Sequence, residues 1–226
     1  MSKTIYNFNE NYFNTIDTQN KAYLLGILAT DGCISTKRNN VSLTLHNKDL
    51  EIIEFFKKEL QSNNRIYINK EYRTLWFSSK IMKNALMSLN VTNRKTYTLQ
   101  FPKILSEFNY DFIRGCIDGD GCWHIRNRIG TKGQPIKPGI LLQFTGSSYP
   151  FLESIQNILM KDTEYTNKIY KIKNKNCYEL KFCGSKQCKK IFDMIYYDRT
   201  QFCLERKYNI VNSYYKRCES NDADTK

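Results

Sequence analysis

The chain contains an internal repeat, and this repeat constrains the fold more than any other feature of its sequence. Residues 23–34 recur as residues 112–123, and both copies keep Gly, Asp-Gly and Cys at the same places, 89 residues apart. Further matches follow at growing offsets, pairing 43–45 with 142–144 at 99, 76–77 with 181–182 at 105, and 94–95 with 206–207 at 112. Offsets that only grow indicate a duplicated unit with extra loop residues in the second copy.

Each copy predicts the same order of elements, αββαββα. A helix capped by Asp17 or Thr18 should run to Asp31, where Asp-Gly ends it. The first copy then predicts strands 33–38 and 41–46 around a turn at Asn39-Asn40, a helix 49–60, strands 65–69 and 73–78, and a helix 80–88. The second copy predicts strands 122–128 and 139–145, a helix 149–160, strands 168–173 and 178–183, a helix 185–196, and a final helix 202–217. The predicted fold class is α+β.

The repeat also predicts the domain organisation. An N-terminal extension, 1–15, precedes a first half-domain, 16–100, and a linker, 101–109, which is entered through Pro102. The second half-domain is expected at 110–217, followed by a polar tail, 218–226, that we expect to be disordered.

The repeated helix carries small residues four apart, Gly26 and Thr30 in one copy and Gly115 and Gly119 in the other. Glycine within a helix costs roughly 1 kcal/mol relative to alanine, so its repetition needs a reason. Small side chains let two helix backbones approach closely. We therefore expect the two copies of this helix to pack against each other about a pseudo-twofold axis.

Each copy of the helix ends in an acid, Asp31 or Asp120. A helix C-terminus carries partial negative charge, so an aspartate there is unfavourable by a few tenths of a kcal/mol or more. If the helices pack together, the two carboxylates also face each other, and a hard divalent cation would reverse both penalties. The alternative is that Asp-Gly only turns the chain into a hairpin, and its occurrence in both copies favours the cation.

Residues 24–32 and 113–121 resemble the nine-residue motif that names the LAGLIDADG family of homing endonucleases, and the resemblance to its single-chain, two-motif members covers residues 16–217. It implies two pseudo-symmetric αββαββα repeats that form a saddle of antiparallel β-ribbons. It further implies an intron-encoded, site-specific, metal-dependent endodeoxyribonuclease that breaks both strands of a long DNA target and leaves 3′ overhangs.

The resemblance also implies roles for individual residues. The eighth motif position, a metal-binding carboxylate, is Asp31 in one copy and Asp120 in the other, with the carbonyls of Thr30 and Gly119 as additional ligands. Two or more Mg²⁺ ions are implied, with Mn²⁺ as a plausible replacement and Ca²⁺ as a non-catalytic substitute. The sixth position, Ala29 or Asp118, is not catalytic, so Ala29 does not argue against activity.

Basic residues are implied around the scissile phosphates. Lys95 and Lys207 occupy matching repeat positions, each after an arginine, while Asn47 and Lys48 follow the second predicted strand. The counterparts of Asn47 and Lys48 are Gly146 and Ser147, which departs from the family pattern and makes the two halves chemically unequal. Any single lysine can instead be an ordinary solvated charge, and the duplication of Lys95 and Lys207 disfavours that reading for this pair.

DNA recognition is expected on the strands, because a two-stranded β-ribbon fits the major groove. Alternation assigns Ile34, Leu43, Leu45, Trp123 and Ile125 to the core. The side chains expected to face outward and contact DNA are Ser35, Lys37, Ser42, Thr44, His46, His124, Arg126, Arg128, Gln143 and Thr145. An ordinary solvated sheet shows the same pattern, so that alternative stays open. The Gly/Pro/Lys-bearing loop 129–138 is expected to be mobile until DNA orders it.

The charge balance supports a polyanionic partner. Lys and Arg outnumber Asp and Glu by 35 to 22, a formal net charge of +13, and nucleic acid is the commonest partner of such a surface. An anionic membrane is the rival partner, but the sequence has no lipidation signal and no apolar run near the roughly 18 residues of a spanning helix. We expect a monomer that binds double-stranded DNA, with intron RNA as another candidate partner. No signal or transit peptide is evident, so an intracellular location in the compartment of its own genome (organelle, bacterium or phage) is expected.

Eight cysteines raise the question of disulfides or zinc. They include no C-x-x-C pair, and only His46 and His124 are available to complete a zinc site. Reduced, mostly buried thiols are the favoured interpretation.

Two functions without DNA cleavage remain open on this fold. Maturases that assist intron splicing bind RNA, and a transcription regulator can keep the fold while losing cleavage. Loss of cleavage should erode the acidic positions, and both acids remain. An intein-borne endonuclease is disfavoured because no splicing segments flank the repeats.

Overall fold

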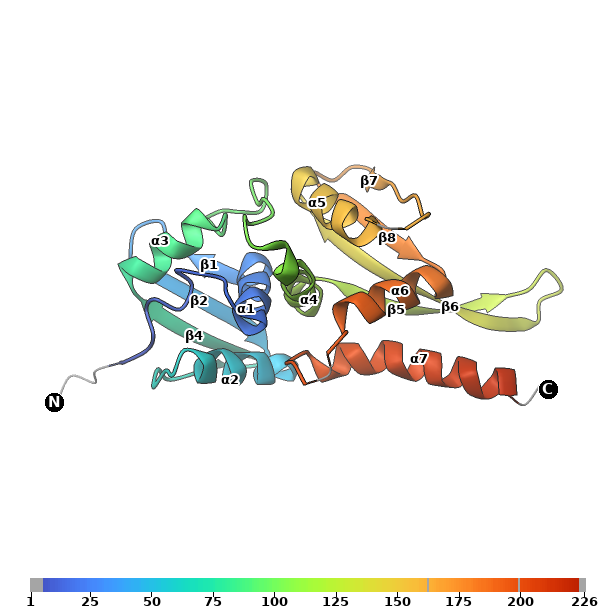
Figure 1. Cartoon of the computed structure of the whole chain (residues 1–226), viewed down its shortest axis with the longest axis horizontal. Helices are drawn as coiled ribbons and strands as arrows, with labels where there is room; N and C mark the ends of the chain where they lie inside the picture. Colours follow the sequence, from blue (N-terminus) through green and yellow to red (C-terminus); the bar gives the residue numbers. More distant parts are fainter. Residues whose placement is uncertain (1–5, 162, 199, 224–226) are drawn as a thin grey trace. The chain divides into compact units, whose positions relative to one another are not determined.

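The computed structural model describes residues 6–161, 163–198 and 200–223, and the chain divides into two compact units, Met1–Gly119 and Asp120–Lys226. Each unit contains one four-stranded antiparallel sheet (Figure 1). The strand orders are β1-β2-β4-β3 and β5-β6-β8-β7, so the same topology occurs twice. The predicted α+β class and the two pseudo-symmetric repeats are confirmed.

The first unit begins with α1 (Gln19–Thr30), whose cap is Thr18, with a side chain that accepts a hydrogen bond from the Lys21 backbone N–H. The elements that follow are β1 (Gly32–Ile34), β2 (Asn40–His46), η1 (Asn47–Asp49), α2 (Leu50–Glu59), β3 (Tyr67–Asn69), β4 (Tyr72–Ser78), α3 (Lys80–Ser88), η2 (Ser106–Phe108) and α4 (Asn109–Gly119). Residues of the predicted extension join this unit's core, since Phe13 is buried and the Phe8 ring lies 4.8 Å from that of Phe77.

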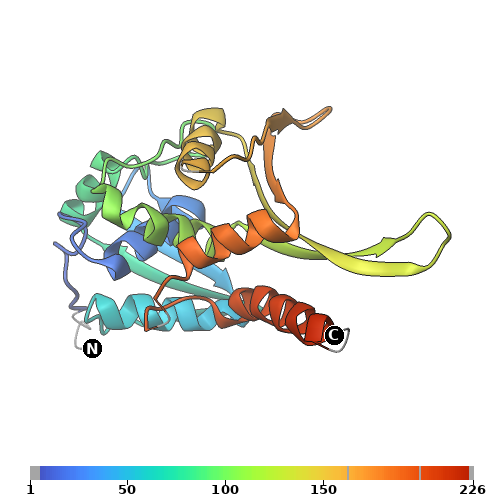
Figure 2. The same ribbon diagram turned by 45° about the vertical axis from the view of Figure 1, so that its right-hand side comes forward.

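The second unit repeats the strand and helix order. Its elements are β5 (Cys122–Ile129), β6 (Pro135–Gly146), α5 (Tyr149–Met160), β7 (Ile169–Lys171), β8 (Tyr178–Cys183), α6 (Ser185–Ile195) and α7 (Glu205–Ala223). Within this unit β5 and β6 form a long hairpin that projects from the rest of the sheet (Figure 2). None of the helices in the described part of the chain is long and apolar enough to span a bilayer.

One face of each sheet is packed with apolar side chains. In the first sheet Leu43, Leu75 and Phe77 are buried against Ile53 and Phe56 of α2. Such a face removes apolar surface from water, at roughly 25 cal/mol per Å² buried. The predicted inward positions Ile34, Leu43, Leu45 and Trp123 are buried, whereas Ile125 is 41% exposed, which corrects its assignment to the core. Ile125 pairs with Ile140, which lies just beyond the β6 residues that pair with β8, and every β5 residue after Trp123 is exposed because the hairpin here extends beyond the rest of the sheet.

Strand register corrects the alignment of the two repeats. Ser42 pairs with Cys33 and Trp76 in the first sheet, and Gln143 pairs with Cys122 and Lys181 in the second. Ser42 therefore corresponds to Gln143, an offset of 101 residues, where the sequence comparison predicts 99. A shift of two residues keeps every side chain on the same face of a strand, so the hydrophobic pattern alone does not distinguish the two alignments.

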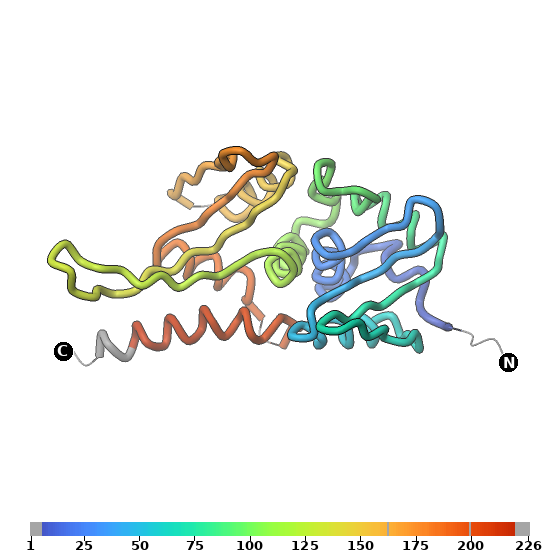
Figure 3. Tube along the Cα trace, turned by 180° about the vertical axis from the view of Figure 1, so that it is seen from behind, coloured from blue at the N-terminus to red at the C-terminus, as the bar shows by residue number. Residues whose placement is uncertain are grey.

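Two segments expected to lack regular structure are ordered. In the predicted loop 129–138, β6 already begins at Pro135, because a turn closed by the Gly130 N–H donating to the Gln134 carbonyl, at 2.8 Å, continues the hairpin (Figure 3). The predicted disordered tail is helical as far as Ala223, where α7 ends, and residues 224–226 lie outside the described residues.

The eight cysteines are thiols, and most are not buried, which corrects the prediction of mostly buried thiols. Cys33, Cys122 and Cys183 are exposed, and only Cys116, Cys188 and Cys203 are buried. The first three lie on the strand faces that point away from the packed helices, where burial is not available. Desolvation raises the pKa of the buried Cys188 thiol to about 12.

Helices α1 and α4 pack backbone against backbone within the first unit. A Cβ added at Gly26 would overlap the Phe112 carbonyl oxygen, and one added at Gly115 would overlap the Tyr23 carbonyl oxygen. Helix propensity alone favours alanine at both positions. The close helix contact predicted from the sequence is therefore present and explains both glycines.

We predict that Gly115→Ala lowers the free energy of unfolding by about 2–4 kcal/mol, because the new methyl group must push two backbones apart. Urea denaturation of the purified protein measures this change. Gly146→Ala is the matched control, since its Cβ would meet only the Leu152 side chain, at 3.9 Å. Equal stabilities of the two variants would contradict the close contact.

Candidate functional site

The end of α1 presents an acidic side chain beside a hydroxyl group. Asp31 is the C-cap, with helical φ −97° and ψ −10°, and its N–H donates to the Ile27 carbonyl at 2.9 Å. Its carboxylate oxygen Oδ2 lies 2.9 Å from the Thr30 hydroxyl, and both residues are half-buried. The Thr30 hydroxyl donates to this oxygen and so orients the carboxylate at the helix end.

The end of α4 lies directly against that carboxylate. A Cβ at Gly119 would overlap both Thr30 Oγ1 and Asp31 Oδ2, so only glycine lets the two helix ends approach this closely. Thr30, Asp31 and Gly119, three of the predicted ligands, are thus brought together in the first unit. Asp120, the fourth, is the next residue after Gly119 and is exposed.

A lysine contacts the backbone just after each acid. Lys95 Nζ donates to the Gly32 carbonyl, and Lys207 Nζ donates to the Gly121 carbonyl at 2.8 Å. Each contact lies within its own unit, so the two lysines occupy equivalent places in the two repeats. An ammonium group at this point offsets the negative end of the helix dipole and the charge of the neighbouring aspartate. Lys207 is buried and Lys95 is half-buried.

The atoms at these helix ends that could bind a metal ion are all oxygens. Carboxylate and carbonyl oxygens suit a hard cation such as Mg²⁺, which also keeps several water ligands. The described residues contain no group of three or more His, Cys, Asp and Glu side chains placed to hold a metal ion. The oxygens available are the Asp31 and Asp120 carboxylates and the neighbouring backbone carbonyls, which are ligand types that a hard cation accepts.

Asn47 and Lys48 both belong to η1, directly after β2, and both are exposed. The Lys48 backbone N–H donates to His46 Nδ1 at 3.1 Å. The offset of 101 residues, continued beyond β2, makes Ser148 and Tyr149 their counterparts, in place of the predicted Gly146 and Ser147. The second repeat lacks an amide and an ammonium at these positions in either alignment.

The predicted DNA-contact residues fall into two groups. Ser42, Thr44 and His46 on β2, His124, Arg126 and Arg128 on β5, and Gln143 and Thr145 on β6 are all half-buried or exposed. Ser35 and Lys37 lie in the turn between β1 and β2 rather than on a strand, because β1 ends at Ile34. No individual contact residue was predicted on the other strands. The register places β4 beside β2 and β8 beside β6, with β3 and β7 as their outer neighbours.

The sequence reasoning also missed a buried polar cluster on α4. At an offset of 89 residues, Ala22, Leu25 and Ala29 of the first repeat correspond to Asp111, Arg114 and Asp118, and all three polar residues are buried. Charged residues at positions that are apolar in the first repeat were the sequence signal for this cluster.

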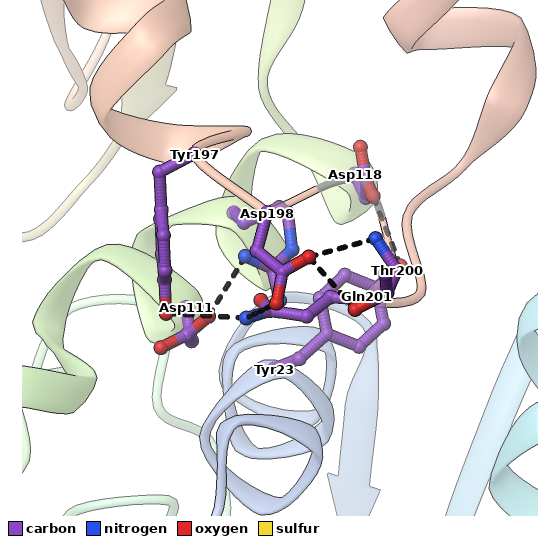
Figure 4. Close-up of polar contacts among 8 residues, drawn as sticks. Tyr23, Asp111, Asp118, Tyr197, Asp198, Thr200 and Gln201 are labelled. Carbon is purple, nitrogen blue, oxygen red and sulfur yellow. Dashed lines mark hydrogen bonds and ion pairs between the residues drawn. The ribbon is translucent and has the colours of Figure 1, made fainter.

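Contacts within the first unit hold this cluster together. Arg114 Nη1 lies 2.8 Å from Asp111 Oδ1, and the Tyr23 hydroxyl of α1 donates to Asp118 Oδ2 at 3.0 Å (Figure 4). The Arg114 guanidinium also lies 5.4 Å from the Tyr23 ring centroid. Tyr23 thus links α1 to two charged residues of α4.

Comparisons with known proteins agree with the repeat architecture. The family model described as "LAGLIDADG-like domain" matches residues 18–98 and again 107–196. No curated protein sequence matches the chain.

Solved structures share the fold at low sequence identity. The LAGLIDADG meganuclease I-AabMI bound to uncleaved DNA is 12% identical with a TM-score of 0.60, over 90% of each chain. The LAGLIDADG homing endonuclease I-LtrWI bound to target DNA is 14% identical with a TM-score of 0.61, over 95% of this chain and 92% of that one. I-SmaMI bound to an uncleaved DNA target with calcium ions is 12% identical with a TM-score of 0.62, over 90% and 92%.

We predict that Tyr23→Phe lowers the free energy of unfolding by about 1–3 kcal/mol, because the buried Asp118 carboxylate loses a hydrogen-bond donor. Phenylalanine fits this helix position, as Phe112 occupies it in the second repeat. Tyr72→Phe, which removes an exposed hydroxyl group, should change stability by less than about 0.5 kcal/mol. If chemical denaturation gives the same midpoint for both variants, the Tyr23–Asp118 contact does not stabilise the fold.

Proposed function

The chain belongs to the LAGLIDADG-like domain family, and on that basis we propose that it is a site-specific, metal-dependent DNA endonuclease that cuts both strands of a long target. The proposal rests on the arrangement at the C-terminal ends of α1 and α4, the first α-helix in each of the two segments that match the family model. In both repeats an aspartate ends the helix and a lysine binds the next backbone carbonyl, Gly32 or Gly121. A purely structural role would not require an aspartate and a lysine at the same helix end in both repeats.

The chain's own residues would act at the scissile phosphates. Asp31 and Asp120 would hold divalent metal, with the Thr30 and Gly119 carbonyls as further ligands, and Mg²⁺, or Mn²⁺ in its place, suits this oxygen set. When bound, such a cation supplies Lewis acidity toward the phosphate and lowers the pKa of a bound water. Lys95 and Lys207, held at the helix ends, would neutralise charge that develops on the phosphate. Asn47 and Lys48 would add an amide and an ammonium on one side only.

Binding would use the outer faces of the two sheets. The net charge of +13 favours a polyanion, and a β-ribbon fits the major groove of double-stranded DNA. The residues predicted for this contact on β2, β5 and β6 have accessible side chains. We propose that the protein acts as a monomer, because one chain carries both repeats, and that its gene lies within an intron.

An intron-RNA-binding maturase and a non-cleaving DNA-binding regulator are the rival functions on this fold. Incubation with plasmid DNA and magnesium distinguishes both from an endonuclease, because neither would linearise a plasmid that contains the target. The gene's neighbourhood would supply that target, since an intron-encoded enzyme is expected to cut the uninterrupted form of its host gene.

We expect Asp31→Asn and Asp120→Asn each to reduce double-strand cleavage by at least about a hundredfold, because each removes a charged metal ligand. Affinity for the target in calcium should change only a few-fold, since loss of the carboxylate also removes repulsion toward phosphate. Cleavage assays in magnesium and binding assays in calcium test both statements. Asp193→Asn, on the exposed side of α6, is the control and should cleave normally. Full cleavage by either site variant would exclude the assignment.

The two DNA strands should be cut at different rates, because Asn47 and Lys48 have no chemical equivalents in the second repeat. A missing cation near the phosphate typically slows a step about tenfold or more, so a nicked intermediate should accumulate. Lys48→Ala should slow only the faster strand, whereas Lys58→Ala, an exposed lysine on α2, should slow neither. Strand-specific end-labelling under single-turnover conditions measures both rates. A single rate constant for both strands, without a nicked species, would refute the asymmetry.

A further inference from the structure

Among the described residues of β1 to β4, none whose side chain lies on the outer face of the first sheet is Lys, Arg, Asp or Glu. Two neighbouring cross-strand rows on this face are Cys33, Ser42 and Trp76, and then Thr44, Thr74 and Tyr67. Trp76 is 47% exposed and Tyr67 55%, and their rings lie 6.4 Å apart in an edge-to-face arrangement. The Thr44 and Thr74 hydroxyl groups are 2.9 Å apart. The other described strand residues on this face are Asn40, His46, Asn69, Tyr72 and Ser78, so none is Lys, Arg, Asp or Glu.

The second sheet presents different chemistry at the same backbone positions. The matching rows are Cys122, Gln143 and Lys181, and then Thr145, Glu179 and Tyr170. Lys181 therefore replaces Trp76, and Glu179 replaces Thr74. Lys181 Nζ lies 2.5 Å from Glu179 Oε2, and both side chains remain partly exposed. The backbone lattice is the same, so only the side chains distinguish what the two faces bind.

Basic residues border the uncharged face of the first sheet. A hollow of about 520 Å³ is lined by Cys33, Ser42 and Trp76 together with Lys37, Arg38 and Arg94. Lysine and arginine at the edge suit phosphates, which position a protein on DNA without reading its sequence. An uncharged floor with basic residues at its edge suits a duplex whose phosphates contact the edge and whose base edges meet apolar and hydroxyl groups.

We propose that the two units read half-sites of different base composition, with Trp76 and Lys181 as the specificity-determining residues. The first unit takes a half-site with a thymine whose C5-methyl group Trp76 contacts, a feature that only T presents in the major groove. The second unit takes a half-site with a G·C pair, because Lys181 donates to guanine O6 and N7 while Glu179 accepts from the cytosine amino group. This inference rests on the proposed site-specific DNA binding.

The test begins by selecting bound sequences from a random 30-bp duplex pool with the full-length protein in calcium. In the selected duplex, deoxyuridine then replaces each thymine in turn, which removes only the methyl group. In the same way 7-deazaguanine replaces each guanine, which removes only the N7 acceptor. For the wild-type protein, removal of one thymine methyl should lower affinity about fourfold, and removal of one guanine N7 should lower it about fivefold or more.

The variants identify which side chain reads each group. The deoxyuridine effect should disappear in Trp76→Ala and persist in Lys181→Met, while the 7-deazaguanine effect should show the opposite pattern. Ile81→Ala on α3 and Lys189→Met on α6 also remove an exposed apolar side chain and an exposed lysine, and should preserve both effects. If no sequence is selected, the proposed function fails and this inference fails with it. If a sequence is selected but both effects survive in both variants, only this inference is overturned.

Discussion

The close contact between α1 and α4 is the interaction on which the rest of the structure depends. At Gly26 and Gly115 the two helix backbones touch, and any larger side chain would overlap a carbonyl oxygen. The same contact brings Gly119 against Asp31 and Thr30 at the far end of the helices. The same helix contact therefore sets both the packing of the first unit and the position of the candidate site. Glycine lowers helix stability, and the close approach that it permits offsets this cost.

The negative charges at the C-terminal ends of α1 and α4 are unfavourable unless a positive charge compensates them. An aspartate at a helix C-terminus adds charge where the helix already exposes carbonyl groups. In both repeats a lysine partly compensates by binding the following carbonyl, Gly32 or Gly121. Compensation of this kind keeps a concentrated set of oxygens near the surface, which suits the proposed metal ligands. On α4, by contrast, Asp111 and Arg114 are wholly buried, and the nearby opposite charge and hydrogen bonds limit the desolvation cost.

The two repeats keep their backbone and diverge in side chains. Strand order, register and helix placement are shared, while Lys181 of the second sheet stands at the position that Trp76 occupies in the first. Backbone hydrogen bonding is indifferent to the side chains on the open face of a sheet, so these positions are able to change without loss of the fold. A single chain with two repeats thus differs from a symmetric dimer, because the residues on each sheet face can change separately.

The sequence by itself determined the duplication, the order of elements, the bounds of α3, α5 and β8, and the inward residues such as Leu43 and Trp123. The duplication is visible as matching segments, and the elements and inward residues depend on local periodicity or capping, which neighbouring residues specify. Only the tertiary structure decided the offset of 101 residues for β6, the exposure of Ile125 and the burial of Asp118. Those features depend on which strand pairs with which, which strand lies at an edge, and which helix covers a side chain. A strand repeats every two residues, so its sequence specifies a face but not a partner.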